Sequence, residues 1–324
     1  MCTAISFNAK NHYFGRTLDL EKRFGEKVII TPRNYVFKLK SGGYIDKHYA
    51  IIGMAVIVEN YPLYFDATNE YGLSIAGLNF VGNAYYSDNL EIDKINLAPY
   101  ELIPYLLSKC KTVDECDEIL KEINLVNIPF NDKLENAQLH WLIADKEKRI
   151  VLECMRAGIK IHQNPVGVLT NNPPFEYQIM NLNNYMELSN LEPKNNFSNK
   201  IDLKAYSRGM GALGLPGDFS SMSRFVKVVF TKLNSVIPDD EISSVSQFFH
   251  ILGTVEQVEG CVIFENQFER TQYMSCCDTE KGIYYYKTYE NSQITAVKMH
   301  SENLDDKALI CYDLKYRESI NYIN

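Results

Sequence analysis

The sequence predicts an α+β fold in which strands pair mainly antiparallel. Strand signals occupy both ends of the 324-residue chain, and pairs of helical patterns lie between them. This order fits two antiparallel sheets stacked face to face, each covered by helices. A hydrophobic content of 46% is enough for a sizeable core. Composition and periodicity alone support only a mixed α and β fold with mainly antiparallel pairing.

Short runs of β-forming residues, separated by turn signals, open the chain. We expect strands at 2–8, 13–20, 27–33, 49–57, 62–66 and 72–79, followed by helices at 98–110 and 112–123. Residues 139–163 predict a three-stranded meander with turns at Asp145-Lys146 and Ala157-Gly158. Helices are expected at 175–187, 221–235 and 243–252, and strands again at 271–277, 282–290 and 293–300.

No linker divides the chain, so one domain over residues 1–324 is expected. Residues 188–217 are rich in polar residues and glycine, which predicts a loop or arm bordering the site. Within it, the run GMGALG at 209–214 matches the G-x-G-x-x-G dinucleotide fingerprint. The following Pro216-Gly217 blocks the helix that such a site requires, and we expect no dinucleotide there.

Charge and composition exclude several function classes. The net charge of −8 argues against nucleic acid as a partner. No apolar stretch has the length of a membrane span and no secretory signal opens the chain, so a cytoplasmic protein is expected. The eight cysteines are then expected to be reduced and mostly buried. With no Cys-x-x-Cys pair and six unpaired histidines, we expect neither a metal nor a cofactor.

Cys2 stands directly behind the initiator Met1. Removal of Met1 would place a thiol and a free α-amine on one residue. An α-amine has a typical pKa of about 7.7–8.0, so it can accept a proton from the attacking side chain. The opening MCTAISF therefore predicts an N-terminal nucleophile. The alternative is that Cys2 is a small hydrophobic residue at the start of a strand.

The next segment adds charge to this prediction. MCTAISF and HYFGRTL are expected to pair as adjacent antiparallel strands, which brings Arg16 and Asp19 towards Cys2. A neighbouring guanidinium favours a thiolate, and a carboxylate can hold an ammonium or a substrate amide. Elsewhere in a chain, Arg16 and Asp19 would be taken for a surface ion pair.

The chain resembles the choloylglycine hydrolases, a family of N-terminal nucleophile hydrolases that includes bile salt hydrolases and penicillin V acylases. The resemblance runs from end to end and rests on ordered blocks, among them MCTAISF, FGRTLDLE, NEYGLSIAGLNF, GVLTNNPPF, GLPGDFSSMSRF and TQYMSCCD. It implies a four-layer αββα sandwich, removal of Met1 and attack of Cys2 on an amide carbonyl.

The resemblance also implies site residues around Cys2. Arg16 and Asp19 would lie beside it, Asn79 and Asn171 around the developing oxyanion, and Arg224 would complete the polar cluster. Asparagine amides suit this role, because donors aimed at the oxyanion lower the barrier most. By residue type alone, Asn171 before Asn-Pro is commonly a turn former, and Arg224 in the first turn of a helix is commonly solvated.

The implied substrate is an amide between a hydrophobic acyl group and a small charged amine, such as a glycine- or taurine-conjugated bile salt. Asn79 favours bile salt hydrolase over penicillin V acylase, which often has tyrosine there. Residues matching the family's acyl pocket are Leu18, Phe24, Phe65, Phe130 and Leu134, although isolated apolar residues are more often core. Thr17-Leu18 departs from the commoner Asn-Met pair. Arg208, in Ser207-Arg208-Gly209, implies a taurine preference through a forked contact to the sulfonate.

Two further hypotheses remain open at this stage. A penicillin V or acyl-homoserine-lactone acylase shares the nucleophile and differs only in substrate. A non-catalytic amphiphile-binding protein would use the same pocket, and retention of Met1 would favour it, because a blocked amine cannot act as a base. The family's usual homotetramer is also expected, with residues 188–217 as a bridge between subunits.

Overall fold

Two antiparallel sheets lie face to face in the computed structural model, which describes residues 1–324. The seven-stranded sheet runs, in spatial order, through β14 (Val168–Leu169), β1 (Cys2–Asn8), β2 (His12–Leu20), β16 (Gln267–Asp278), β17 (Ile283–Thr288) and β18 (Asn291–Lys298), with β15 (Val262–Phe264) paired to β16. The eight-stranded sheet runs through β13 (Gly158–Gln163), β12 (Arg149–Met155), β11 (Leu139–Ala144), β8 (Ser74–Asn79), β7 (Tyr61–Asn69), β6 (Ile51–Val58), β3 (Lys27–Thr31) and β19 (Ile310–Asp313).

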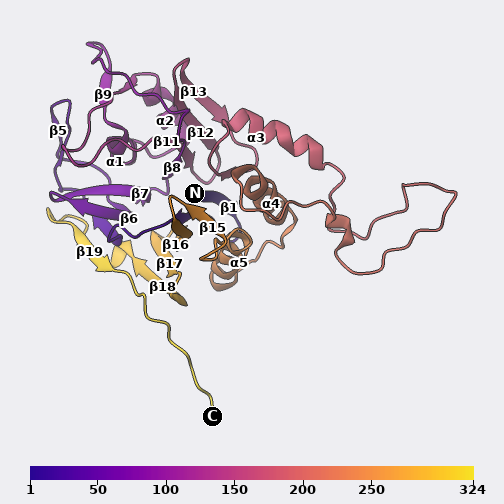
Figure 1. The fold of residues 1–324 in the computed structure, drawn as a ribbon. Helices are drawn as coiled ribbons and strands as arrows, with labels where there is room; N and C mark the ends of the chain where they lie inside the picture. The colour runs from indigo at the N-terminus through magenta and orange to yellow at the C-terminus, as the bar shows by residue number, and fades with distance from the viewer.

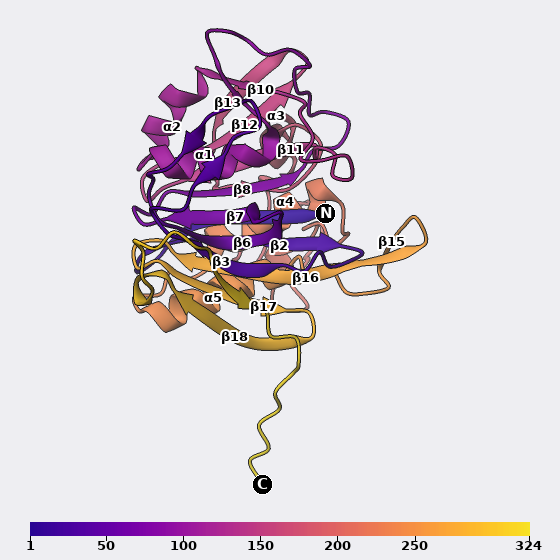
Figure 2. The same ribbon diagram turned by 90° about the vertical axis from the view of Figure 1, so that its left-hand side faces the viewer.

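Helices cover the outer face of each sheet, which completes the expected αββα order (Figure 1). On the eight-stranded sheet lie η1 (Pro99–Glu101), α1 (Leu102–Lys109) and α2 (Val113–Leu120). On the seven-stranded sheet lie α4 (Ser221–Asn234) and α5 (Glu241–Gly253), and α3 (Phe175–Asn181), continued by η2 (Leu182–Tyr185), packs on α4. Figure 2 shows α4 and α5 behind the strands and α1 and α2 on the opposite side.

The sequence explains which strands lie deepest. β1 and β2 are buried along almost their whole length, because the second sheet covers one face and helices α4 and α5 cover the other. Their near-continuous runs of buried residues contrast with β18, where buried and exposed residues mix. The N-terminus therefore lies in the middle of the molecule (Figure 1), at the start of one of its most buried strands.

The ladder between β7 and β8 is short, and this opens the interior. The two strands pair only from Asp66 opposite Ala76 to Thr68 opposite Ser74. Beyond Asp66 and Ala76 the strands separate, although β8 stays paired with β11 as far as Asn79. The resulting fork between β7 and β8 faces the start of β1. It leaves both strands unpaired on the edge that faces the fork, while β7 stays paired with β6 and β8 with β11.

The predicted long elements all form, with ends within a few residues of those expected. The structure adds short strands that have little signal of their own: β4 (Phe37–Lys38), β5 (Tyr44–Ile45), β9 (Ile95–Leu97), β10 (Ile123–Leu125), β14, β15 and β19. Segments of two to four residues become strands only because a partner happens to lie alongside. The strand prediction at 62–66 ended at Asp66, the first of the three residues of β7 that pair with β8, and missed the last residues of the strand.

Two segments lie outside the layers. Residues 188–217 form an excursion with one short turn, η3 (Met210–Ala212), and both this excursion and the C-terminal tail extend away from the sheets (Figure 1). None of the helices is long and apolar enough to cross a membrane. All eight cysteines are free, and only Cys261 and Cys311 are exposed.

Gly15 on β2 marks the closest approach of two strands and supports a stability prediction. A Cβ at this position would lie 2.1 Å from the main-chain oxygen of Ser275 on β16. Backbone cannot move aside cheaply in a sheet buried on both faces, so Gly15→Ala is expected to destabilise the protein by about 3 kcal/mol or more. Urea unfolding, followed by the fluorescence of Trp141, measures this change.

Gly217→Ala is the matched control, because a Cβ there meets nothing within 4 Å. Its free energy of unfolding should stay within about 0.5 kcal/mol of the parent value. Equal effects of the two substitutions would show that the approach of β2 to β16 does not limit packing.

Candidate active site

Pairing of β1 with β2 builds the centre of the site. Cys2 lies opposite Leu18 and Ala4 opposite Arg16. Residues two apart on a strand share a face, so Cys2, Leu18 and Arg16 all face the second sheet. Thr17 and Asp19 face the helices α4 and α5 instead. Arg16 and Asp19 are 1% and 0% exposed and make no ion pair with each other, which excludes the surface pair considered from the sequence.

Arg16 spans the fork between β7 and β8. Its Nη1 donates to the main-chain oxygens of Phe65 on β7 and Gly77 on β8, and its Nε donates to Thr17 O at 3.1 Å. These bonds satisfy carbonyl groups that the interrupted ladder leaves free. Burial alone would lower the pKa of Arg16, but its electrostatic interactions with the acidic groups of Cys2, Tyr273 and Asp66 raise it above its usual value. The guanidinium is therefore a fixed positive charge beside Cys2.

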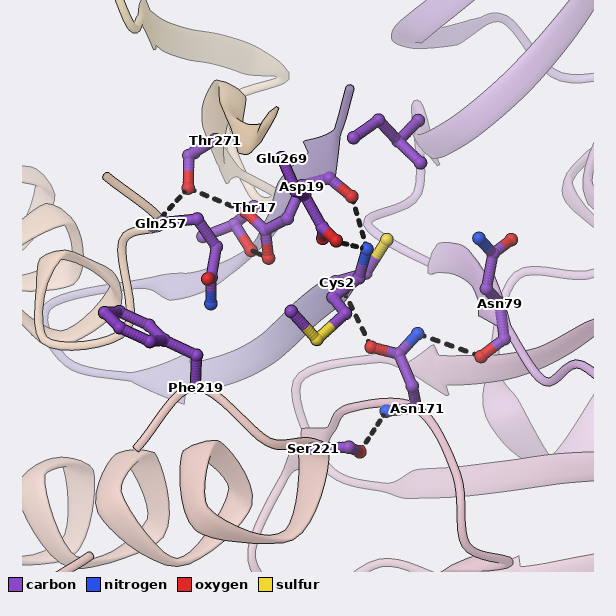
Figure 3. Close-up of polar contacts among 12 residues, drawn as sticks. Cys2, Thr17, Asp19, Asn79, Asn171, Phe219, Ser221, Gln257, Glu269 and Thr271 are labelled. Carbon is purple, nitrogen blue, oxygen red and sulfur yellow. Dashed lines mark hydrogen bonds and ion pairs between the residues drawn. The ribbon is translucent and has the colours of Figure 1, made fainter. Parts of the chain in front are cut away.

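Asp19 and the chain terminus meet on the other face of β2. The carboxylate of Asp19 accepts hydrogen bonds from Thr17 Oγ1 at 2.9 Å and Thr271 Oγ1 at 2.7 Å. The amine of Met1 donates to the main-chain oxygen of Asp19 and to the carboxylate of Glu269 on β16. Burial raises the pKa of Glu269, and the adjacent amine partly offsets that effect. Figure 3 shows Cys2 between these carboxylates and the two asparagines.

Asn171 and Arg224 hold the main chain of Cys2. Asn171 Oδ1 accepts hydrogen bonds from Cys2 N and from Arg224 Nη2, both at 2.8 Å. Arg224 Nη1 donates to Cys2 O and to Thr3 Oγ1, both at 2.6 Å. Arg224 lies in the first turn of α4, where an arginine is commonly solvated. It is nevertheless only 1% exposed, because it points inward to the first residues of β1. Burial lowers its pKa, against the nearby charges of Asp19, Cys2 and Glu269.

The two asparagines also touch each other. Asn171 Nδ2 donates to the main-chain oxygen of Asn79 at 2.9 Å and keeps one further N–H (Figure 3). Asn79 ends β8 and lines the same cavity as Cys2, so its side-chain amide faces that cavity. Both predicted oxyanion residues thus lie next to the nucleophile. Their roles in a reaction stay predictions.

An apolar cavity of about 320 Å³ leads to Cys2 through the fork, and 16 of its 21 lining residues are hydrophobic. All five residues predicted for an acyl pocket line this cavity: Leu18, Phe24, Phe65, Phe130 and Leu134. Phe24 and Leu134 are 46% and 39% exposed, which places them at its rim. Such a volume and lining fit the bulk of a small hydrophobic ligand, since ligand pockets span about 300–1,000 Å³.

Sequence reasoning missed several residues and misplaced one. Glu269, Thr271 and Gly77 carry no signal of their own, because only the sheet order brings them to Cys2. Arg208 was expected near the cavity mouth, but it is exposed on the excursion and does not line the cavity of its own chain. Most of the excursion projects to one side of the layers, away from the sheets that hold the cavity (Figure 1).

Arg16 supports a direct test of the electrostatics. Arg16→Gln removes the positive charge nearest the sulfur, so the thiolate form of Cys2 is less favoured. We expect alkylation of Cys2 by iodoacetamide at pH 7 to slow by about tenfold, corresponding to about 1.4 kcal/mol. Mass spectrometry of the N-terminal peptide gives the rate.

Arg33→Gln serves as the control, since Arg33 pairs with Glu70 and Asp305 away from Cys2. It should leave the alkylation rate unchanged. Equal rates for the parent and Arg16→Gln would mean that Arg16 acts only on the main chain of the fork.

Comparison with known proteins finds matches along nearly the whole chain. The family model described as linear amide C–N hydrolases, choloylglycine hydrolase family, matches residues 2–312. A bile salt hydrolase/transferase of Lactiplantibacillus plantarum is 54% identical over 325 residues, covering 100% of both chains. A bile salt hydrolase/transferase of Clostridium perfringens is 39% identical over 330 residues, again covering 100% of both chains.

Solved structures show the same relationship. A variant of the conjugated bile acid hydrolase from Clostridium perfringens has a TM-score of 0.92 at 38% identity and covers 100% of both chains. Penicillin V acylase from Agrobacterium tumefaciens has a TM-score of 0.77 at 17% identity, covers 97% of this chain and 92% of its own, and shares the fold. The chain therefore belongs to the choloylglycine hydrolase family of linear amide C–N hydrolases.

Proposed function

We propose that the protein hydrolyses the amide bond of glycine- or taurine-conjugated bile salts through Cys2, once Met1 has been removed. The observation that carries this proposal is the position of Cys2, which lines an apolar cavity and is flanked by Arg16 and Asn79. The bile salt hydrolase/transferases that it resembles over their full length support the choice of substrate.

Removal of Met1 turns the nitrogen of Cys2 into the base. This nitrogen already donates to Asn171 Oδ1 at 2.8 Å. A neutral α-amine held by that bond keeps its lone pair for the thiol proton. Sγ then attacks the amide carbon, the C=O electron pair moves to the oxygen, and the ammonium passes its proton to the leaving nitrogen. The C–N bond breaks, which releases glycine or taurine and leaves an acyl thioester on Cys2.

The oxyanion formed in this step needs donors that are already in place. The side-chain amide of Asn79 faces the cavity, and Asn171 Nδ2 has one N–H left after its bond to Asn79 O. Loss of one such donor typically costs about 100- to 1000-fold in rate. We propose that these two amides stabilise the oxyanion and that Arg16 favours the thiolate before attack.

Water then hydrolyses the thioester. The α-amine takes a proton from the water, the hydroxide attacks the acyl carbon, and Cys2 leaves as the thiol with the bile acid as the second product. An amine in place of water gives the transferase reaction that the names of the two relatives include. Because the cavity is mostly apolar, the acyl part of the substrate is held by burial of its hydrocarbon surface.

Cys2→Ala tests the nucleophile. The side chain is small and 2% exposed, so the variant should fold with an unchanged circular dichroism spectrum. Release of taurine from taurocholate, measured with ninhydrin, should fall by more than about a thousandfold. Mass spectrometry of the active parent should show that Met1 is absent.

Other outcomes point to the alternatives. Loss of Met1 without release of amino acid, together with turnover of penicillin V, would make the protein an acylase of another substrate. Saturable binding of conjugated bile salts without turnover, in a chain that keeps Met1, would make it a binding protein. Release of taurine by Cys2→Ala at the parent rate would contradict the proposed nucleophile.

We also propose that the chain assembles as a homotetramer through the excursion 188–217. The excursion carries exposed apolar side chains with nothing of its own chain to cover them, including Leu191, Phe197, Tyr206 and Leu213. Exposed apolar surface of this kind is typical of contact sites. Arg208 lies on the same segment, so any contact with a substrate sulfonate would occur in the site of a neighbouring subunit.

Arg208→Ala tests this contact. A guanidinium can fork onto a sulfonate, so we expect the ratio of kcat/KM for taurocholate to that for glycocholate to fall by about fivefold, or about 1 kcal/mol. Lys204→Ala, an exposed cation on the same excursion, is the control and should leave the ratio unchanged. An unchanged ratio in Arg208→Ala would remove Arg208 from substrate choice.

A further inference from the structure

A buried pair of charged residues lies behind the two asparagines and has no part in the mechanism above. His140 on β11 and Glu153 on β12 are both 0% exposed. His140 Nδ1 and Glu153 Oε1 are 3.2 Å apart, and His162 on β13 approaches Glu153 Oε2 at 3.2 Å. Neither His140 nor Glu153 lines the apolar cavity. Burying an ionisable pair is costly in free energy. Because this pair does not line the cavity, its position in the fold needs an explanation.

The partners of His140 define its hydrogen bonds. Its Nε2 lies 2.9 Å from the main-chain oxygen of Thr170, which can only accept a hydrogen bond, so Nε2 is the donor. Its Nδ1 is hydrogen-bonded to the carboxyl group of Glu153. Burial alone would raise the pKa of Glu153, but the hydrogen bond and charge of His140 hold it below its usual value, in agreement with a carboxylate.

His140 and Glu153 form hydrogen bonds with the two ends of the segment that carries Asn171. His140 Nε2 donates to Thr170 O, directly before Asn171, and Glu153 Oε1 accepts from Phe175 N at 2.9 Å. Between these ends, Asn171 N donates to Ser221 Oγ at 2.8 Å and Gln178 Nε2 donates to Asn171 O. The segment 170–175 is thus held at each end by one member of a single ion pair.

His140 also contacts Phe80, the residue next to Asn79. Its ring stacks on Phe80, with centroids 4.3 Å apart and planes 7° apart. Phe80 directly follows Asn79. A displacement of the His140 ring would therefore move the chain next to both asparagines at once.

We propose that His140 and Glu153 are positioning residues that hold Asn79 and Asn171 in register as a pair of oxyanion donors. The inference rests on the proposed function, since it needs an oxyanion beside Cys2. Neither residue touches the reacting atoms, so both act through the two asparagines. We therefore expect them to affect stabilisation of the transition state, and not binding of the acyl group, which the cavity provides.

His140→Gln and Glu153→Gln separate these contributions. Each variant is neutral and removes the ion pair, and Glu153→Gln keeps the shape of the side chain. Because the donors are misaligned rather than lost, we expect kcat for taurocholate to fall by about 10- to 100-fold, with KM within about twofold. His162→Gln is the matched control, because it removes the other imidazole beside Glu153 and leaves both contacts to segment 170–175, so it should stay within about threefold of the parent.

An aldehyde analogue of cholic acid gives a second readout that a purely structural role would not move. Sγ of Cys2 adds to the aldehyde carbon, and the former carbonyl oxygen takes the place of the oxyanion. Its inhibition constant should rise in His140→Gln and Glu153→Gln by the same factor by which kcat/KM falls. The inhibition constant of free cholate, which has no tetrahedral oxygen, should stay unchanged.

The outcomes are distinct. Parallel losses in kcat/KM and aldehyde affinity, with unchanged cholate affinity and melting temperature, support the proposal. Unchanged aldehyde affinity, or equal losses of aldehyde and cholate affinity, would overturn it. If His140→Gln does not fold, Glu153→Gln decides by the same criteria. A parent protein that neither releases taurine nor forms the aldehyde adduct would overturn the proposed function itself, and this inference with it.

Discussion

The site depends on the burial of one guanidinium, that of Arg16, between two sheets. A buried cation needs hydrogen-bond acceptors and negative charge. The carbonyl groups of Phe65 and Gly77 provide the first, because β7 and β8 separate at that point and leave them unpaired. Interactions with the acidic groups of Cys2, Tyr273 and Asp66 favour the charged form of the guanidinium. The same separation of strands opens the apolar cavity, so the buried charge of Arg16 and the cavity beside Cys2 have a common structural origin.

Cys2 has different surroundings on its two sides. Towards the second sheet lie the apolar cavity, Arg16 and Asn79. Towards α4 lie Asp19, Glu269 and Arg224, which hold the main chain and the terminus. The alternation of side chains along β1 and β2 produces this division. It suits an amide with a hydrophobic acid and a polar amine, because the two halves of the substrate require opposite environments on either side of the scissile bond.

The polar groups around the nucleophile are fixed before any substrate arrives. Asn171 is held through its main chain by Ser221 and Gln178 and through its side chain by Cys2, Arg224 and Asn79. In the role proposed for Asn171, a donor held in this way does not have to reorient as the oxyanion forms, and preorganised donors of this kind are usually the largest source of electrostatic stabilisation in acyl transfer. The ion pair behind segment 170–175 extends this rigidity into the eight-stranded sheet.

The sequence by itself determined the long strands and helices, because strand and helix periodicity are local properties, and the chemistry of an N-terminal cysteine predicts Cys2 as the nucleophile. The set of residues expected around Cys2 came from the resemblance to the choloylglycine hydrolases, which runs along the whole chain. The spacing along β2 also predicts that Arg16 and Asp19 point to opposite faces of the sheet, since residues three apart on a strand face opposite sides. Only the tertiary structure decided that Arg224 is buried, that Glu269 reaches the terminus, and that Arg208 lies away from its own cavity. Those facts follow from the order of strands in the sheets and the path of the excursion, which depend on contacts between distant segments and have no local signal.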